Sequence, residues 1–361
     1  MNKLNRYLSI ALVIQLVVLL VSHIARNPSS TAKPTKLFDK LDVEKVNWLR
    51  IEEGRDETDA KKKQSVVELA KEDGKWVLKS GGDFPAKKDK ITEFLGKLPG
   101  LIAGQPVATS KRFHRKLEVA DDKYQRKVAV KVEDGRSYRF VLGSSPAIKS
   151  VHLRLEGKDD VYLVKDLTAW DASATPTDWV ESDYFKVKRD NVVALTLVNK
   201  NGEIKLSKGA DGKWTLEGME EGATLKQSEV DSLLSSASSV NLQQPVGREV
   251  KPSYELGQEK ASARLTVEVE QKPDKPDKPD KPPASMPATP PARVTHTLTV
   301  GAKKDDSYYV KSGASQFVVR AATWAVEPLV NKKPTDLWEK KEEKKKEEGS
   351  GAGSKEKKEK K

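Results

Sequence analysis

Apolar residues follow three patterns along this chain. Residues 7–24 form one uncharged run dominated by Leu, Val and Ile. In the body of the chain, stretches such as 127–133 and 264–270 alternate apolar and polar residues, which is typical of a strand with one buried face. Two further stretches, 88–101 and 227–240, repeat their apolar residues every three or four positions. That spacing predicts helices with one apolar stripe.

The first apolar run predicts a membrane anchor. At 1.5 Å per residue, a helix over this run spans about 27 Å, close to the thickness of a bilayer core. The run follows Lys3 and Arg6, as a secretory signal does, but no small residues at the required spacing offer a cleavage site. We therefore expect an uncleaved transmembrane helix at 7–25, between a cytoplasmic start at 1–6 and a linker at 26–36, in preference to a removed signal peptide.

The orientation of this segment is decided by its position. Basic residues flank the run on both sides, so the positive-inside comparison is nearly balanced. A single hydrophobic segment at the start of a chain most often leaves its short end in the cytoplasm. We therefore expect a single-pass protein of the bacterial inner membrane with its body in the periplasm.

The body of the chain contains two copies of one unit. An Asp-Gly-Lys-Trp motif ends at Trp76 in the first copy and at Trp214 in the second. Each copy then has a helical stretch, a Gln-Pro-Val motif and an alternating strand, in the same order. Later matches pair Trp170 with Trp324, and Trp179 with Trp338. So many ordered matches indicate an internal duplication.

The predicted fold class is α+β. We expect two tandem duplicated units at 37–185 and 186–338, each an antiparallel sheet with a helix packed on one face, preceded by one N-terminal transmembrane helix. The Asp-Gly pairs at 73–74 and 211–212 predict tight hairpin turns. A Pro-rich insertion at 271–293 enlarges the second unit between two strands. The Lys/Glu-rich tail at 339–361 is almost free of apolar residues, and we expect it to be disordered.

The charge of the chain limits its partners. The net charge is +12, but the excess lies mainly in the first 36 residues, the insertion and the tail, which leaves the body nearly neutral. A nucleic-acid-binding domain concentrates positive charge on one face, so we expect no nucleic-acid partner. The chain has no cysteine, which excludes disulfides and thiol nucleophiles.

One local stretch, 111–139, is different, because basic residues outnumber acidic ones there by two to one. A solvated strand-and-turn surface is the simplest interpretation of such a stretch. The alternative is a binding site for an anionic or glycan ligand. Its candidate residues are Arg112, Arg115, Lys116 and Arg126.

No motif for catalysis or metal binding is present in the sequence. The histidines stand apart from one another and from carboxylates at ligand spacing, so we predict no catalytic residue, metal site, cofactor or enzymatic activity. Asp178 and Asp336 recur in both copies; we expect them to cap turns, and a carboxylate pair of an envelope hydrolase is the alternative. Trp76 and Trp214 are expected to cover their own sheets rather than to stack on a sugar ring.

Several of these features together resemble the domain of unknown function 4340 family. They are the Asp-Gly-Lys-Trp hairpins, the Gly-Gln-Pro-Val segment after the first helix, the strand end at Gly143, and the segment 178–185 that leads into 192–198. The resemblance covers nearly the whole chain apart from the insertion and the tail. It implies a bacterial envelope protein encoded beside ABC-transporter subunits of the gliding-motility type, without accepted chemistry.

The expected function follows from the anchor, the duplication and this resemblance. We expect a non-enzymatic, membrane-anchored, extracytoplasmic accessory or scaffold protein with partners among membrane transporter subunits. The alternatives are a binding module for an anionic or glycan ligand through 111–139, and an envelope hydrolase that uses a carboxylate pair.

Overall fold

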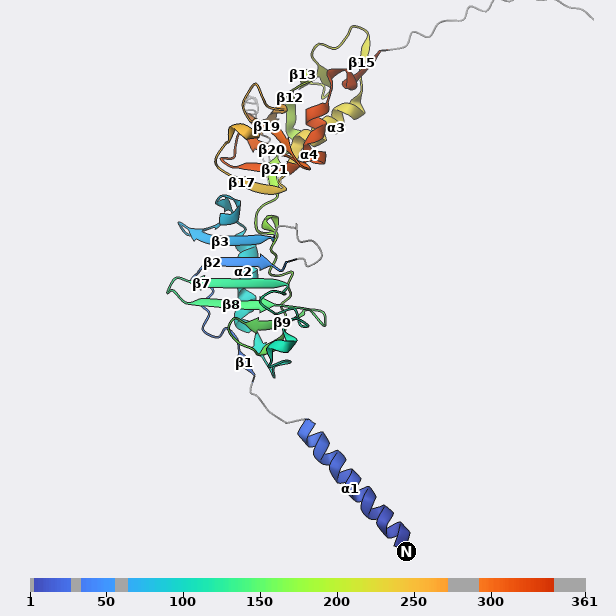
Figure 1. Cartoon of the computed structure of the whole chain (residues 1–361). Helices are drawn as coiled ribbons and strands as arrows, with labels where there is room; N and C mark the ends of the chain where they lie inside the picture. Colours follow the sequence, from blue (N-terminus) through green and yellow to red (C-terminus); the bar gives the residue numbers. More distant parts are fainter. Residues whose placement is uncertain (1–2, 27–33, 56–63, 272–291, 341–361) are drawn as a thin grey trace, which may run out of the picture. The chain divides into compact units, whose positions relative to one another are not determined.

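The computed structural model describes residues 3–26, 34–55, 64–271 and 292–340 (Figure 1). The chain divides into two compact units, Met1–Glu181 and Ser182–Lys361. Each unit is built around an antiparallel sheet of eight strands, and helices contribute few residues.

The sheet of the first unit takes its strands from both halves of the unit. The central strand β2 pairs with its sequence neighbour β3 on one side and with the distant β7 on the other, both antiparallel. In order across the sheet the strands are β10 (Val161–Lys165), β9 (Ser150–Leu155), β8 (Ser137–Leu142), β7 (Arg126–Val132), β2 (Val46–Glu53), β3 (Val66–Glu72), β4 (Lys75–Leu78) and β5 (Phe84–Pro85).

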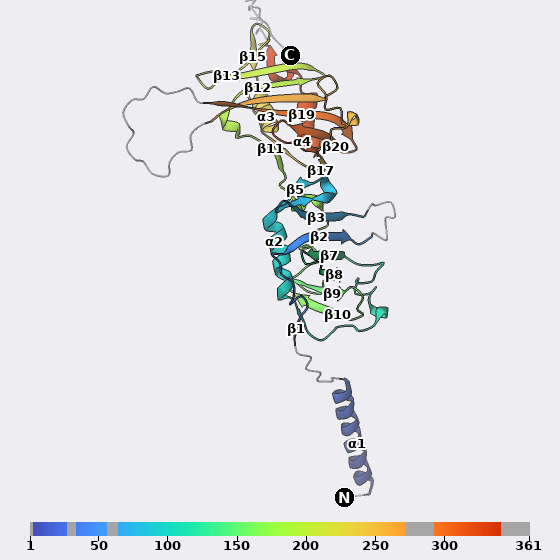
Figure 2. The same cartoon turned by 90° about the vertical axis from the view of Figure 1, so that its left-hand side faces the viewer.

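One face of this sheet forms the core of the first unit. The helix α2 (Lys88–Lys97) runs along that face (Figure 2). It buries Ile91 and Phe94, and β2 contributes the fully buried Leu49 and Ile51 to the core. Successive strand residues point to opposite faces. Trp48, Arg50 and Glu52 therefore lie on the other face, which we call the open face.

The sheet of the second unit has the same plan. Its central pairs are β12 with β18 and β18 with β19. In order across the sheet the strands are β14 (Trp214–Leu216), β13 (Gly202–Lys208), β12 (Val192–Asn199), β18 (Ala263–Glu270), β19 (Arg293–Lys304), β20 (Ser307–Ser312), β21 (Val318–Ala322) and β17 (Gln244–Gly247).

Two helices pack in the second unit, where the sequence predicts one. The predicted helix is α3 (Gln227–Ser238), which buries Val230, Leu233 and Leu234. The additional helix α4 (Thr323–Asn331) contacts α3 and several strands of the sheet. The core of this unit therefore includes a pair of helices on one sheet face.

Short strand pairs complete both units. They are β1 (Thr35–Lys36) with β6 (Ile102–Ala103), β11 (Asp183–Lys186) with β16 (Ser239–Asn241), and β15 (Ala223–Leu225) with β22 (Trp338–Lys340). The first two residues assigned to the predicted tail, Glu339 and Lys340, thus belong to a strand. Residues 341–361 of the tail and 272–291 of the Pro-rich insertion lie outside the described residues.

The strand orders agree with an internal duplication. The run β10-β9-β8-β7-β2-β3-β4 of the first sheet corresponds to β21-β20-β19-β18-β12-β13-β14 of the second. The same irregularity in strand register recurs, between Val46 and Trp48 in β2 and between Val192 and Ala194 in β12. Both the order and the detail of the pairing are therefore repeated.

The structure corrects one match between the copies. The carbonyl of Trp179 accepts a hydrogen bond from the backbone N–H of Lys87, just before α2. The carbonyl of Leu337 accepts the corresponding bond from Lys226, just before α3. Trp179 and Leu337 are both fully buried. Trp179 therefore corresponds to Leu337 and not to Trp338.

The predicted fold class is wrong in two respects. An α+β fold is expected, but two eight-stranded antiparallel sheets make up most of the described structure and helices contribute few residues. In addition, no helix within the described residues is long and apolar enough to cross a membrane, so the transmembrane helix expected at 7–25 is not supported. The helix found there is α1 (Lys3–Arg26).

Candidate binding site

A loop of the first unit folds over one end of the open face. This loop, residues 104–125, places Ala108, Val119 and Tyr124 against Val141 of β8 and Val161 of β10, and the five side chains form a small second core. Gly143 makes the close approach possible, since a Cβ atom there would lie 2.1 Å from the carbonyl oxygen of Leu117 in the loop. The loop therefore borders the rest of the open face as a wall.

A buried arginine fastens this loop to the sheet. Arg154 is buried, with a side chain that is 5% exposed. Its Nε donates to the carbonyl of Val119 at 2.7 Å, and a second nitrogen donates to the Asp121 carboxylate at 2.6 Å. That hydrogen bond from Arg154 lowers the pKa of Asp121. Arg154 is thus a structural residue that holds the loop in place.

Two of the isolated histidines also serve this region. His114 is buried, with its Nε2 at 2.8 Å from the carbonyl oxygen of Asp159. His152 has its Nδ1 at 3.1 Å from the Ser144 hydroxyl, and burial lowers the pKa of its imidazole. Within the described ranges, no three His, Asp or Glu side chains gather as metal ligands.

The four predicted ligand-binding residues do not share one environment. Arg112, Arg115 and Lys116 are exposed on the loop; the Arg112 guanidinium lies over the Phe113 ring, and Arg115 pairs with Asp122. Arg126 instead donates to the carbonyls of Ala172 and Gln125, at 3.0 Å and 2.7 Å. Burial lowers the pKa of Arg126. Arg126 therefore holds backbone in place and is separated in role from the three loop cations.

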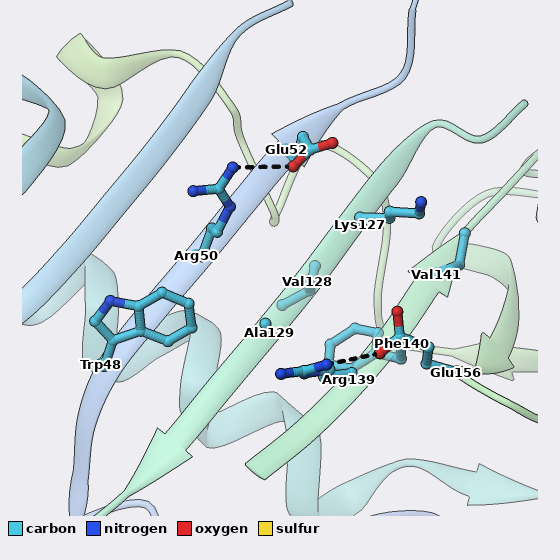
Figure 3. Close-up of a pocket in the computed structure, with 10 residues that line it drawn as sticks. All are labelled: Trp48, Arg50, Glu52, Lys127, Val128, Ala129, Arg139, Phe140, Val141 and Glu156. Atoms are coloured by element: carbon cyan, nitrogen blue, oxygen red, sulfur yellow. Dashed lines mark hydrogen bonds and ion pairs between the residues drawn. The ribbon is translucent and has the colours of Figure 1, made fainter. Parts of the chain in front are cut away.

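A hollow of about 210 Å³ lies on the open face beside the loop. Its centre is Ala129 on β7, whose direct neighbours across the sheet are Arg50 on β2 and Arg139 on β8 (Figure 3). Figure 3 shows the two arginines on either side of β7. The hollow is lined by Trp48, Arg50, Glu52, Lys127, Val128, Ala129, Arg139, Phe140, Val141 and Glu156.

Each arginine of the hollow is paired with glutamate. Arg50 lies 3.2 Å from Glu52 and 3.5 Å from Glu68. Arg139 lies 3.5 Å from Glu156, and its side chain is 58% exposed. Strong hydrogen bonds of this kind measure about 2.7–2.9 Å. The pair of Arg139 is therefore loose.

A hydrogen-bond network fixes Glu52 at the border between the hollow and the loop. Its Oε1 accepts from the Tyr124 hydroxyl at 2.7 Å and from the Gln64 amide at 3.1 Å. Burial opposes the charged form of Glu52, but the hydrogen bonds from Tyr124 and Arg50 outweigh it and lower the pKa of this carboxyl. Burial and the contact with Glu52 raise the pKa of Tyr124 to about 12.

Trp48 closes the lower side of the hollow in Figure 3. Its indole N–H donates to Glu68 at 3.0 Å, and the Lys131 ammonium lies 4.3 Å from its ring centroid. One face of the indole is therefore covered by a cation of the same sheet, and the ring is a fixed wall.

The second unit has the same backbone here and different side chains. The strand registers place Thr196, Thr266 and Thr297 in one row across β12, β18 and β19, where the first unit has Arg50, Ala129 and Arg139. Gly313 donates its N–H to the carbonyl of Thr297, as Glu156 does to Arg139, so Gly313 corresponds to Glu156. The fold therefore does not require the charged lining of the first unit.

Two tryptophans are unusually exposed. Trp170, which follows β10, is 83% exposed, and Trp324, in the first turn of α4 after β21, is 77% exposed. The sequence repeat pairs them, but the strand registers do not: Trp170 lies five residues beyond the end of β10 at Lys165, and Trp324 lies two residues beyond the end of β21 at Ala322. The hairpin tryptophans differ from them, since Trp76 is buried and Trp214 is half-buried, with lysine ammonium groups over both rings.

The repeated aspartates have local structural roles. Asp178 accepts from the Ser173 hydroxyl at 2.5 Å, beside the buried Trp179. Asp336 accepts from the backbone N–H of Lys333 at 3.0 Å and so caps the turn at Pro334–Leu337. Each carboxylate thus serves its own turn.

Comparison with known proteins assigns a family and no activity. A family profile described as Domain of unknown function (DUF4340) matches residues 76–259, about half of the chain, and the chain belongs to this family. The match runs from the first hairpin tryptophan into the second unit. No curated protein and no solved structure shows significant similarity to the chain.

Sequence reasoning missed the lining of the hollow. Trp48, Arg50 and Glu52 alternate with buried apolar residues, so their common face is visible in the sequence. Their neighbours on β7 and β8, however, come from far along the chain. Only the strand register brings Ala129 and Arg139 beside them.

Proposed function

We propose that this protein is a non-enzymatic accessory or scaffold protein of a bacterial envelope complex, with its two units on the extracytoplasmic side. Its partners on this proposal are subunits of an ABC-type transporter, the company that the family resemblance implies. The observation that carries the proposal is the exposure of one tryptophan in each unit, in the segment that follows the corresponding strand, β10 or β21.

A solvent-exposed tryptophan is uncommon and often marks a surface that binds another molecule. The indole offers a large apolar surface, and tryptophan is enriched among the residues that dominate binding energy in protein interfaces. Trp170 and Trp324 present this surface to solvent from two units of the same design. A protein that contacts its partners through one exposed tryptophan of each unit accounts for both.

The first of these tryptophans is held on a fixed support. The neighbouring Asp171 pairs with Lys97 of α2 at 2.6 Å and accepts from the backbone N–H and the hydroxyl of Thr168. The segment that carries Trp170 is thereby fastened to α2. A tryptophan on a fastened segment has less backbone freedom to lose on binding, which favours an interface role.

The test is co-purification of transporter subunits from detergent-solubilised membranes at native expression. We expect Trp170→Ala combined with Trp324→Ala to reduce recovery of the subunits by about ten-fold or more, with smaller losses for each single variant. The matched control is Ile148→Ala, because Ile148 is 95% exposed in the first unit and belongs to neither tryptophan position.

Thermal unfolding of the variants separates binding from folding. Since both tryptophans are exposed, the midpoints of the variants should equal that of the parent chain. Equal recovery of transporter subunits with the double variant and the parent, or recovery of no such subunit with the parent, would contradict the proposal.

A further inference from the structure

The open face of the first unit supports a further inference, which does not depend on the exposed residues Trp170 and Trp324. The hollow around Ala129 combines two flanking arginines with carboxylates and a fixed indole wall, and its row of Arg50, Ala129 and Arg139 is replaced by three threonines at the matched sheet positions of the internal copy.

The size of the hollow restricts its occupant. Its volume of about 210 Å³ equals roughly seven water molecules at ~30 Å³ each. Sites for drug-sized ligands and cofactors usually enclose about 300–1,000 Å³. The hollow therefore accepts one small unit and excludes a nucleotide or a larger cofactor.

The charge pattern restricts the occupant further. Arg50 and Arg139 lie one strand to either side of Ala129, and strands are about 4.8 Å apart, so their Cα atoms are about 10 Å apart. Arg139 is exposed and loosely paired, which leaves its planar guanidinium able to bind a carboxylate through two parallel hydrogen bonds.

The glutamates of the lining argue against a polyanion. Glu52 and Glu156 stand at two sides of the hollow and would repel a second anionic group on the ligand. The same carboxylates accept hydrogen bonds from hydroxyl groups. A ligand that carries one carboxylate together with several hydroxyls satisfies both kinds of lining group.

The internal copy provides the comparison that separates function from folding. At the corresponding positions the second unit has Thr196, Thr266, Thr297 and Gly313, and its sheet retains the same pairing. The sheet itself thus has no need of Arg50, Arg139 or Glu156. Their presence in one unit alone points to a task that the other unit does not perform.

We propose that the hollow on the open face of the first unit binds an acidic sugar unit of the hexuronate class. Arg139, supported by Arg50, binds the carboxylate above Ala129. Glu52 and Glu156 accept hydrogen bonds from the hydroxyls, and the edge of Trp48 limits the depth to one ring.

The experiment measures binding of D-glucuronate to the purified full chain by calorimetry or by ligand-observed NMR. We expect glucuronate to bind at least about ten-fold more tightly than D-glucose, because the neutral sugar lacks the charge-assisted hydrogen bonds. Arg139→Thr, which installs the residue of the second unit, should weaken glucuronate binding by about ten-fold or more.

A matched control uses an arginine from the second unit. Arg293 on β19 is 61% exposed and lies 3.7 Å from Glu268, a pair much like that of Arg139 with Glu156. Arg293→Thr should leave glucuronate affinity unchanged. Ala129→Thr, a side chain that the same position of the second sheet accommodates as Thr266, should fill the hollow and abolish binding without lowering the unfolding midpoint.

Three results would overturn the proposal. One is the absence of glucuronate binding to the parent chain. Another is equal affinity for glucose, which would remove the role of the carboxylate. The third is full displacement of glucuronate by inorganic phosphate at equal concentration, which would reduce the hollow to a simple anion site.

Discussion

The two units have sheets of the same plan but fasten their covering loops by different means. In the first unit, the buried Arg154 holds the loop 104–125 through hydrogen bonds to Val119 and Asp121. In the second, the corresponding loop is residues 248–262, between β17 and β18, and its Tyr254 stacks on Tyr309 of β20 with ring centroids 4.1 Å apart. The glycines beneath the two loops, Gly143 and Gly301, are equally crowded by loop backbone.

This difference shows which parts of the unit the fold constrains. Strand order, the register irregularity in the first long strand and the close approach at the glycine are common to both units. The side chains that hold the covering loop and those that line the open face differ between the two units. Residues that differ while the backbone stays the same are the ones available for binding.

The largest expected effect concerns the aromatic clamp of the second unit. Tyr254→Ala removes a stacked ring that is only 9% exposed, and large-to-small changes of this kind cost about 3 kcal/mol or more. The free energy of unfolding, measured in denaturant, should fall by this amount at both low and high salt. A loss below about 1 kcal/mol would mean that the loop is held by other contacts.

The polar clamp of the first unit should be worth somewhat less. Arg154→Met keeps the apolar stem and loses the hydrogen bonds to Val119 and Asp121, so we expect a loss of about 2 kcal/mol in the same measurement. Asp121→Asn is the control: its side chain is 83% exposed, and an exposed ionic partner contributes under about 1 kcal/mol. Equal losses for the two variants would place the strength of the clamp in the ion pair and contradict its assignment to the backbone acceptor.

The smallest expected effect is a pH dependence confined to the first unit. Burial opposes ionisation of Asp171, but hydrogen bonds from Lys97 and Thr168 prevail and lower its pKa. A carboxyl whose folded pKa is depressed stabilises the fold above its unfolded pKa of about 3.9, and this contribution is lost as the pH falls through the folded value.

Asp171→Asn should therefore cost about 1–2 kcal/mol at pH 7, and the difference from the parent chain should shrink as the pH falls below about 4. Unfolding in denaturant at several pH values measures this. Glu93→Gln is the control, because Glu93 pairs with the same Lys97 at 3.6 Å but is 58% exposed. A difference between Asp171→Asn and the parent that does not change with pH would show that packing, and not charge, accounts for the effect.

The sequence predicted the helices and turns whose formation depends mainly on neighbouring residues. The helices α2 and α3 begin at Lys88 and Gln227, the first residues of the two predicted helical stretches. The first predicted turn is a tight hairpin, with positive φ at Asp73 and Gly74. The second, at Asp211-Gly212, is a longer connection between β13 and β14, with a positive φ at Gly212 alone of the pair.

Other features depended on contacts between distant parts of the chain. The helix α4 contains Pro328, which removes one backbone hydrogen bond and normally argues against a helix; contacts with α3 and the sheet stabilise it. The strand register that creates the hollow around Ala129 could likewise not be predicted from the sequence. Long-range antiparallel pairing is fixed by the whole sheet and not by any one stretch of sequence.

The hairpin of β18 and β19 makes the second unit a convenient place for protein engineering. Glu270 pairs with Arg293 at the tip of the hairpin, and the N–H of Gln271 donates to the carbonyl of Ala292 at 2.9 Å, so the chain leaves the sheet and returns to it at neighbouring points. The entropy of closing a loop grows only slowly with its length. A fluorescent domain or an affinity tag inserted between 272 and 291 would therefore report on this protein while both sheets and the hollow of the first unit stay intact.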